Sequence, residues 1–193
     1  MKLPSPRLRS LALLSLMAAF ALAAPMAGAQ DVLVDKSEIR FVAKQLGVNV
    51  DGRFRKWKAN VVFLPADLAK SKAEFDIDLG SIDLASEDSE REIRGGLWFD
   101  TAKFPVAHFS STAIRDLGGD KYEIAGALTL KGVKRDIVVP IALKKDAAGN
   151  RVAEGGFTLM RLDYNIGTGM WSDTRTVTND VVVRVRIVLP PAA

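Results

Sequence analysis

The chain has 193 residues and no cysteine, which excludes disulfides, thiol chemistry and cysteine-based metal sites. It carries 27 basic and 23 acidic residues, but three of the basic ones, Lys2, Arg7 and Arg9, lie within the first 29 residues. The remainder holds 24 basic against 23 acidic residues. This near-neutral balance argues against a nucleic-acid partner, which requires a strongly basic domain.

Residues 1–29 have the three parts of an export signal. The basic residues precede an apolar run over residues 11–24, and small residues at 27–29 form a cleavage site. The apolar run is shorter than the about 20 residues that a membrane-spanning helix needs, which disfavours the alternative of a retained anchor. We expect cleavage before Gln30, export to the periplasm, and a single domain over residues 30–193.

Most of the remaining chain shows the alternation of apolar and polar residues that is typical of half-buried strands. In residues 72–79, Ala73, Phe75, Ile77 and Leu79 share one face and charged residues occupy the other. Similar segments cover residues 38–44, 58–64, 106–116, 121–130, 134–143, 151–162 and 179–189. About eight such strands predict an all-β fold, either an antiparallel sandwich or a barrel. A closed barrel of this size has either a filled core or room for one ligand, and composition fits both.

Residues 86–94 predict a short helix. Ser86 can cap its start, acidic residues occupy its first turn and basic residues its last, and Gly95 with Gly96 ends it.

Residues 126–140 predict a β-hairpin. Two alternating segments flank Lys131 and Gly132, and glycine allows the positive φ that a tight turn needs. Leu128 and Leu130 share one face before the turn. We expect this hairpin to belong to a sheet that encloses something apolar.

The polar clusters predict neither catalysis nor a metal site. His108 is the only histidine, and no serine occupies a G-x-S-x-G turn, so the usual zinc site and a serine triad are not expected. Asp76 and Asp78 share the polar face of one strand. Carboxylates placed in this way do not flank a substrate, and a solvated sheet face is the expected role.

Two further segments are each open to two interpretations. Residues 53–58 alternate basic and aromatic side chains, which fits either an edge that contacts anionic lipid headgroups or an ordinary strand with a charged outer face. The alternation favours the ordinary strand. Residues 167–171 lack the Lys-Ser/Thr of a phosphate loop. We expect Met170 and Trp171 to form a lip over an apolar cavity or to pack within the loop.

A series of short motifs follows in order along residues 30–193. They lie at residues 37–41 with 46–48, 52–54 with 63–65, 81–83, 98–100 with 103–105, 109–111, 126–134 and 161–173. In this order they resemble the YceI-like, polyisoprenoid-binding family of exported proteins with a lipocalin-like barrel. Lys36 and Gln45 stand where the family often has histidine, and Asn165 where it often has glycine. If those histidines contact a ligand head group, this chain would select a different one.

The resemblance implies an antiparallel, lipocalin-like β-barrel and a non-catalytic protein that binds a long-chain isoprenoid-type lipid. No cofactor is expected other than a bound isoprenoid lipid or quinone. From strand alternation, with either face open to inversion, we expect seven ligand-lining side chains: Phe41, Phe75, Ile77, Phe109, Leu128, Phe157 and Leu159. Three further residues are expected nearer an entrance: Trp98, Arg161 and Trp171.

An alternative function is a partner protein that presents a quinone-type isoprenoid to a membrane oxidoreductase. It would need a docking surface, for which residues 53–58 or the pair Arg184 and Arg186 are candidates. We also expect transient contact with a membrane surface. The oligomeric state is left open, a dimer included.

Overall fold

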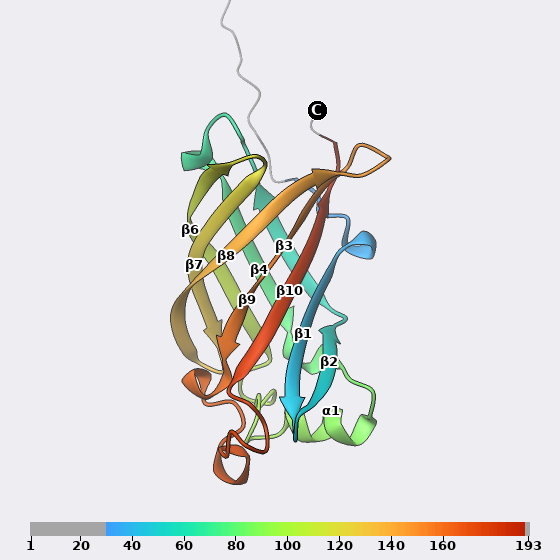
Figure 1. Cartoon of the computed structure of the whole chain (residues 1–193), viewed down its shortest axis with the longest axis vertical. Helices are drawn as coiled ribbons and strands as arrows, with labels where there is room; N and C mark the ends of the chain where they lie inside the picture. The colour runs from blue at the N-terminus through green and yellow to red at the C-terminus, as the bar shows by residue number, and fades with distance from the viewer. Residues whose placement is uncertain (1–29, 192–193) are drawn as a thin grey trace, which may run out of the picture.

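The computed structural model describes residues 30–191, so the predicted export signal over residues 1–29 lies outside the described residues. Ten strands form one antiparallel sheet that curls into a lipocalin-like barrel (Figure 1). The strands are β1 (Glu38–Gln45), β2 (Val48–Phe54), β3 (Trp57–Val62), β4 (Lys72–Asp78), β5 (Ile82–Asp83), β6 (Val106–Gly118), β7 (Lys121–Leu130), β8 (Val133–Lys145), β9 (Arg151–Met160) and β10 (Asp180–Leu189). The predicted fold class is confirmed.

All eight predicted strands are present, as β1, β3, β4 and β6 to β10. The structure adds β2 and the two-residue β5. β2 follows the same alternation, with Val48, Val50 and Phe54 opposite Asn49, Asp51 and Arg53, so the sequence held a signal for it that the prediction did not use. The strand count therefore rises from about eight to ten without a change of fold class.

The barrel closes where the chain passes from β2 to β3 and changes its partner strand. The strand order is β3-β4-β6-β7-β8-β9-β10-β1-β2-β5, and neighbours from β3 to β2 are antiparallel, so β2 and β3 point the same way. Only Arg55 and Lys56 separate them. The chain therefore pairs with β1 through β2 and then with β4 through β3. Two backbone hydrogen bonds hold the crossing, from Arg55 N to Ser81 O at 3.1 Å and from Asp78 N to Lys56 O at 3.0 Å.

β7 and β8 form the predicted hairpin, with Leu130 paired to Val133 across the turn. Lys131 and Gly132 both have positive φ, at 48° and 75°, as the favoured two-residue hairpin turn requires. Leu128 and Leu130 are both buried. The hairpin and its apolar face are confirmed.

The predicted helix is present as α1 (Glu87–Arg94). The Ser86 hydroxyl accepts a hydrogen bond from Ser89 N, and Gly95 follows the last turn. α1 lies at the end of the barrel that also carries the β1–β2 turn and the β9–β10 loop, called the α1 end below (Figure 1). The β6–β7 and β8–β9 turns lie at the opposite end. Among residues 30–191, no helix has the length and apolar character needed to cross a membrane.

Candidate ligand-binding cavity

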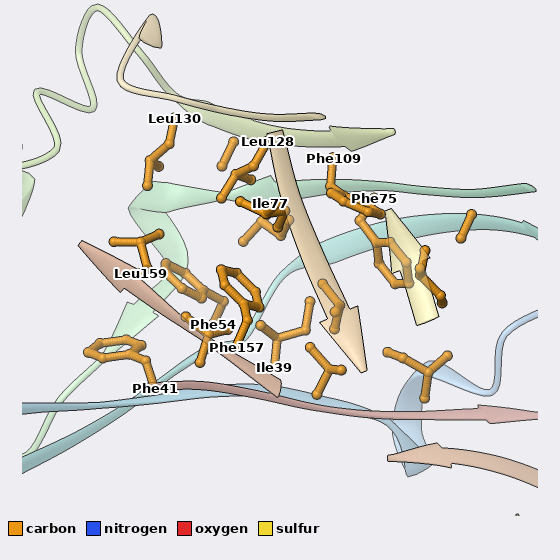
Figure 2. A pocket seen from close by; sticks show the side chains of 18 of the residues that line it. Ile39, Phe41, Phe54, Phe75, Ile77, Phe109, Leu128, Leu130, Phe157 and Leu159 are labelled. Carbon is orange, nitrogen blue, oxygen red and sulfur yellow. The ribbon is translucent and has the colours of Figure 1, made fainter. Parts of the chain in front are cut away.

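A cavity of about 250 Å³ runs inside the barrel. At the end of the barrel opposite α1, the cavity is bordered by Lys72, Tyr122 and Leu143. At the α1 end it is bordered by Phe99 and Ile166. Nearly all the side chains between them are apolar, and Figure 2 shows ten of these around one space: Ile39, Phe41, Phe54, Phe75, Ile77, Phe109, Leu128, Leu130, Phe157 and Leu159. The barrel interior is therefore a lined space as well as a packed core.

The lining follows from strand alternation. Every second residue of β4 and β10 faces inward, which contributes Ala73, Phe75 and Ile77 from the first strand and Val181, Val183, Val185, Ile187 and Leu189 from the second. The β7–β8 hairpin adds Leu128, Leu130, Ile137, Val139 and Ile141. Because the sheet is curled, these inward faces meet around a common interior.

Two glycines make room for aromatic rings in this wall. A Cβ on Gly126 of β7 would lie 2.5 Å from the ring of Phe109, and a Cβ on Gly52 of β2 would collide with the ring of Phe41. Each ring therefore lies across a neighbouring strand that has no side chain at that point. Glycine in a strand often marks such a close approach.

The structure brings nine of the ten sequence-predicted site residues to the cavity wall: Phe41, Phe75, Ile77, Trp98, Phe109, Leu128, Phe157, Leu159 and Arg161. Trp171 does not line the cavity. Its ring packs 5.4 Å from that of Trp98, and its Nε1 donates to Glu92 Oε1 at 2.9 Å. That these residues contact a ligand stays a prediction.

Arg161 lies at the α1 end and is only 1% exposed. A guanidinium has five N–H donors, and Arg161 directs its three nitrogens at five backbone carbonyls, with distances of 2.7 to 2.9 Å. The acceptors are the carbonyls of Ile166, Gly167, Trp171, Val177 and Thr178. Burial lowers the pKa of this side chain. Arg161 thus organises the β9–β10 loop, and its donors are engaged there.

Sequence reasoning missed several residues of the wall at the α1 end. Phe54 and Phe99 both line the cavity and pack on each other with ring centroids 6.3 Å apart. Ile166 lines it from the β9–β10 loop. Phe99 and Ile166 lie in loops, where no period marks the inward face. For this part of the wall, the adjacent aromatic residues Trp98 and Phe99 were the one signal in the sequence.

The polar clusters lie on the outer surface of the sheet. His108 Nδ1 lies 2.7 Å from Asp76 Oδ1 on the neighbouring strand, and both side chains are about half exposed. Among residues 30–191, the His, Asp and Glu side chains form no cluster of three or more that could hold a metal ion.

Residues 53–58 span the end of β2 and the start of β3, with their charged side chains outward and their aromatic side chains inward. Arg53 and Arg55 both bind Asp83, at 2.6 and 2.5 Å. Trp57 is buried, and Phe54 lines the cavity. This is the ordinary-strand arrangement that the alternation favoured.

The comparisons with known proteins agree with this geometry. The model of the YceI-like domain matches residues 31–189. A UPF0312 protein of Azotobacter vinelandii is 30% identical over 187 residues, which cover 92% of this chain and 96% of that protein. The crystal structure of BcnA from Burkholderia cenocepacia matches with a TM-score of 0.78 and 36% identity, over 82% of this chain and 99% of that one.

A more distant structure shares the fold. It is a polyisoprenoid binding domain from Saccharophagus degradans implicated in plant cell wall breakdown. The TM-score is 0.65 at 18% identity, over 86% of this chain and 99% of that one.

Proposed function

The chain belongs to the YceI-like family, and from this premise we propose that it is a non-catalytic binding protein for an isoprenoid or similar long-chain amphiphilic lipid. It stores, sequesters or carries that lipid. The observation that supports this most directly is the long cavity with an almost wholly apolar wall. The isoprenoid class comes from the likeness to the polyisoprenoid binding domain of Saccharophagus degradans.

The length of the wall and its apolar chemistry suit an extended apolar chain. On β7 alone the lining runs from Tyr122 to Leu130, which is roughly 27 Å of strand at about 3.4 Å per residue. Each CH₂ group moved from water into such a space gains about 0.8 kcal/mol. A long hydrocarbon tail would therefore bind tightly without any ion pair.

Within the same proposal, residues 1–29 direct export to the periplasm and are removed before Gln30. N-terminal sequencing of the exported protein tests this directly. A mature chain that begins at Met1 would contradict it.

We place the transient membrane contact at the α1 end. Leu46 and Val48 at the β1–β2 turn and Met170 in the β9–β10 loop are 73%, 67% and 78% exposed. The two segments are joined, because Leu46 N donates to Thr176 O at 2.8 Å. The alternative site at residues 53–58 is less suited, since Arg53 and Arg55 are engaged by Asp83.

The quinone-presenting alternative gains no specific support. Its candidate docking residues Arg53 and Arg55 are paired with Asp83, and Arg186 is paired with Glu154, whereas Arg184 is exposed and has no ion pair among residues 30–191.

The lipid-binding proposal is tested by filling the cavity. Ala107 on β6 is 4% exposed and lines the cavity, whereas the next residue, His108, faces outward. We expect Ala107→Phe to reduce the lipid recovered by native mass spectrometry and organic extraction, while His108→Phe leaves recovery unchanged. Repeated recovery of lipid-free wild-type protein that takes up no polyprenyl lipid would refute the proposal.

A further inference from the structure

Two aromatic rings meet across the interior at the end of the barrel opposite α1. The rings of Phe63 and Tyr122 make an edge-to-face contact, with centroids 5.2 Å apart and planes at 90°. Phe63 directly follows β3, and Tyr122 is the second residue of β7. In the sheet, β4 and β6 lie between these two strands, so the rings are not neighbours along the wall. The two rings, called the end pair below, therefore reach across the interior.

The end pair belongs to the last layer of the cavity wall. Both residues line the cavity, and Tyr122 is buried while Phe63 is half-buried. By alternation, Tyr122 shares the inward face of β7 with Ile124, which also lines the cavity. Lys72 pairs with Val62, the residue before Phe63, and is exposed to solvent. The end pair thus lies where the apolar wall meets water.

The backbone around Phe63 is fixed on both sides. The Phe63 carbonyl accepts a hydrogen bond from Gln30 Nε2 at 3.0 Å, and Gln30 Oε1 accepts one from Arg151 Nη2 at 2.9 Å. The next residue, Leu64, donates its backbone N–H to Ser71 Oγ at 2.9 Å. Arg151 and Ser71 are both buried. These bonds fix the position from which the Phe63 ring projects.

The distance from the end pair to the α1 end limits an extended tail. The β7 lining covers roughly 27 Å of strand at about 3.4 Å per residue. Strands in a barrel are tilted by about 35–45°, which leaves roughly 20 Å along the axis. An extended isoprene unit adds four bonds of about 1.5 Å to the chain, and with tetrahedral bends it covers roughly 5 Å. The cavity therefore encloses an extended tail of about four units.

We propose that the end pair sets the longest tail that the cavity can enclose. The tail enters from the α1 end, where exposed Leu46 and Met170 would contact a membrane, and its terminal methyl groups rest against Phe63 and Tyr122. This rests on the proposed lipid-binding function and adds to it a length limit, two specificity residues and an orientation. Units beyond the limit gain little, because no apolar wall remains for them.

The test compares polyprenyl alcohols with two, four and six isoprene units, which share one head group. Relative affinities are measured by competition between equal amounts in native mass spectrometry. For wild type we expect at least about a hundredfold gain from two units to four, because each buried CH₂ group contributes about 0.8 kcal/mol. From four units to six the gain should be less than about threefold.

Two variants should move this limit in opposite directions. Tyr122→Ala removes one ring of the end pair and should favour the six-unit over the four-unit alcohol about tenfold more than wild type does. Ile124→Phe adds a ring one layer further inside, so it should weaken the four-unit alcohol about tenfold and change the two-unit alcohol less than twofold. Tyr122→Phe is the matched control, since it keeps the ring and loses only the hydroxyl. It should keep the wild-type preference.

A nuclear Overhauser measurement on wild type locates the tail without any variant. The chain has two tyrosines, and Tyr164 is 3% exposed but lies outside the cavity wall. With the four-unit alcohol bound, the ring protons of Tyr122 should contact the terminal methyl groups of the tail, whereas those of Tyr164 should not.

Several results would overturn the inference alone. They are contacts from Tyr122 to the CH₂–OH group instead of the tail methyl groups, a wild-type length preference in either Tyr122→Ala or Ile124→Phe when that variant folds, and an altered preference in Tyr122→Phe. If wild type binds none of the three alcohols, the proposed function itself fails.

Discussion

Arg161 shows how one buried side chain can hold a loop together. Five backbone carbonyls between Ile166 and Thr178 accept its hydrogen bonds. Lysine has a single nitrogen and cannot reach them all, and each buried carbonyl left unpaired costs about 1–3 kcal/mol. We expect Arg161→Lys to lower the free energy of unfolding by about 3 kcal/mol in urea denaturation. The control Arg135→Lys, where an exposed arginine binds one carbonyl of Asp163, should cost under about 0.5 kcal/mol. A loss below about 1 kcal/mol for Arg161→Lys would contradict this account.

Asp83 gives the protein a defined sensitivity to acid. Hydrogen bonds from Arg55 and Arg53 lower the pKa of this carboxyl from an ordinary 3.8 to about 2. Because the pKa is lower in the folded state, its stabilising contribution is present above about pH 4 and is lost as the pH falls toward 2. We expect the unfolding free energy of wild type to decline over this window, and Asp83→Asn to decline less. Equal slopes for the two proteins in urea melts from pH 5 to pH 2 would exclude this role.

At the scale of elements, the β7–β8 hairpin depends on the backbone of its turn. Gly132 has a φ of 75°, and a Cβ there would lie 2.8 Å from the ring of Phe104. Gly132→Ala should therefore lower the free energy of unfolding by about 1–2 kcal/mol, the cost of a left-handed residue with a side chain. Gly96→Ala is the matched control, since a Cβ there meets nothing within 4 Å. Similar urea midpoints for the two variants would show that the turn does not constrain the hairpin.

The elements also show how far sequence reasoning reaches. Alternation revealed eight strands and the inward positions of Phe75, Leu128 and Leu159, because a strand repeats every two residues and one face is buried. The same period is present in β2, where Val50 and Phe54 alternate with polar residues, but the prediction did not use it. Alternation could not reveal the partner change at Arg55 and Lys56, because that change depends on distant strands. The α1 end was least predictable, since its loops follow no period.

Over the whole molecule, the exposed apolar side chains of the α1 end lie close to the end of the cavity. Leu97 and Met170 join Leu46 and Val48 there, since the backbone N–H of Gly167 donates to Leu97 O at 2.9 Å and the β9–β10 loop is bonded to the β1–β2 turn. Val177 and Ile166 of the same loop line the cavity. A lipid leaving a bilayer at this end would meet apolar side chains both outside and inside the barrel.

This arrangement predicts that membrane contact depends on apolar residues of the α1 end. The double variant Leu46→Ser with Met170→Ser should bind uncharged phosphatidylcholine vesicles about tenfold more weakly in flotation assays. Full burial of each side chain is worth about 1.5–3 kcal/mol, and contact at the membrane surface buries only part of each side chain. Leu117→Ser is the matched control, since Leu117 is 58% exposed near the β6–β7 turn at the opposite end. Binding that instead required anionic lipid and fell with Arg53→Glu and Arg55→Glu would place the contact on residues 53–58. Because the patch is apolar, we also expect binding to change little between low and high salt, whereas contact through arginines would weaken as salt screens it.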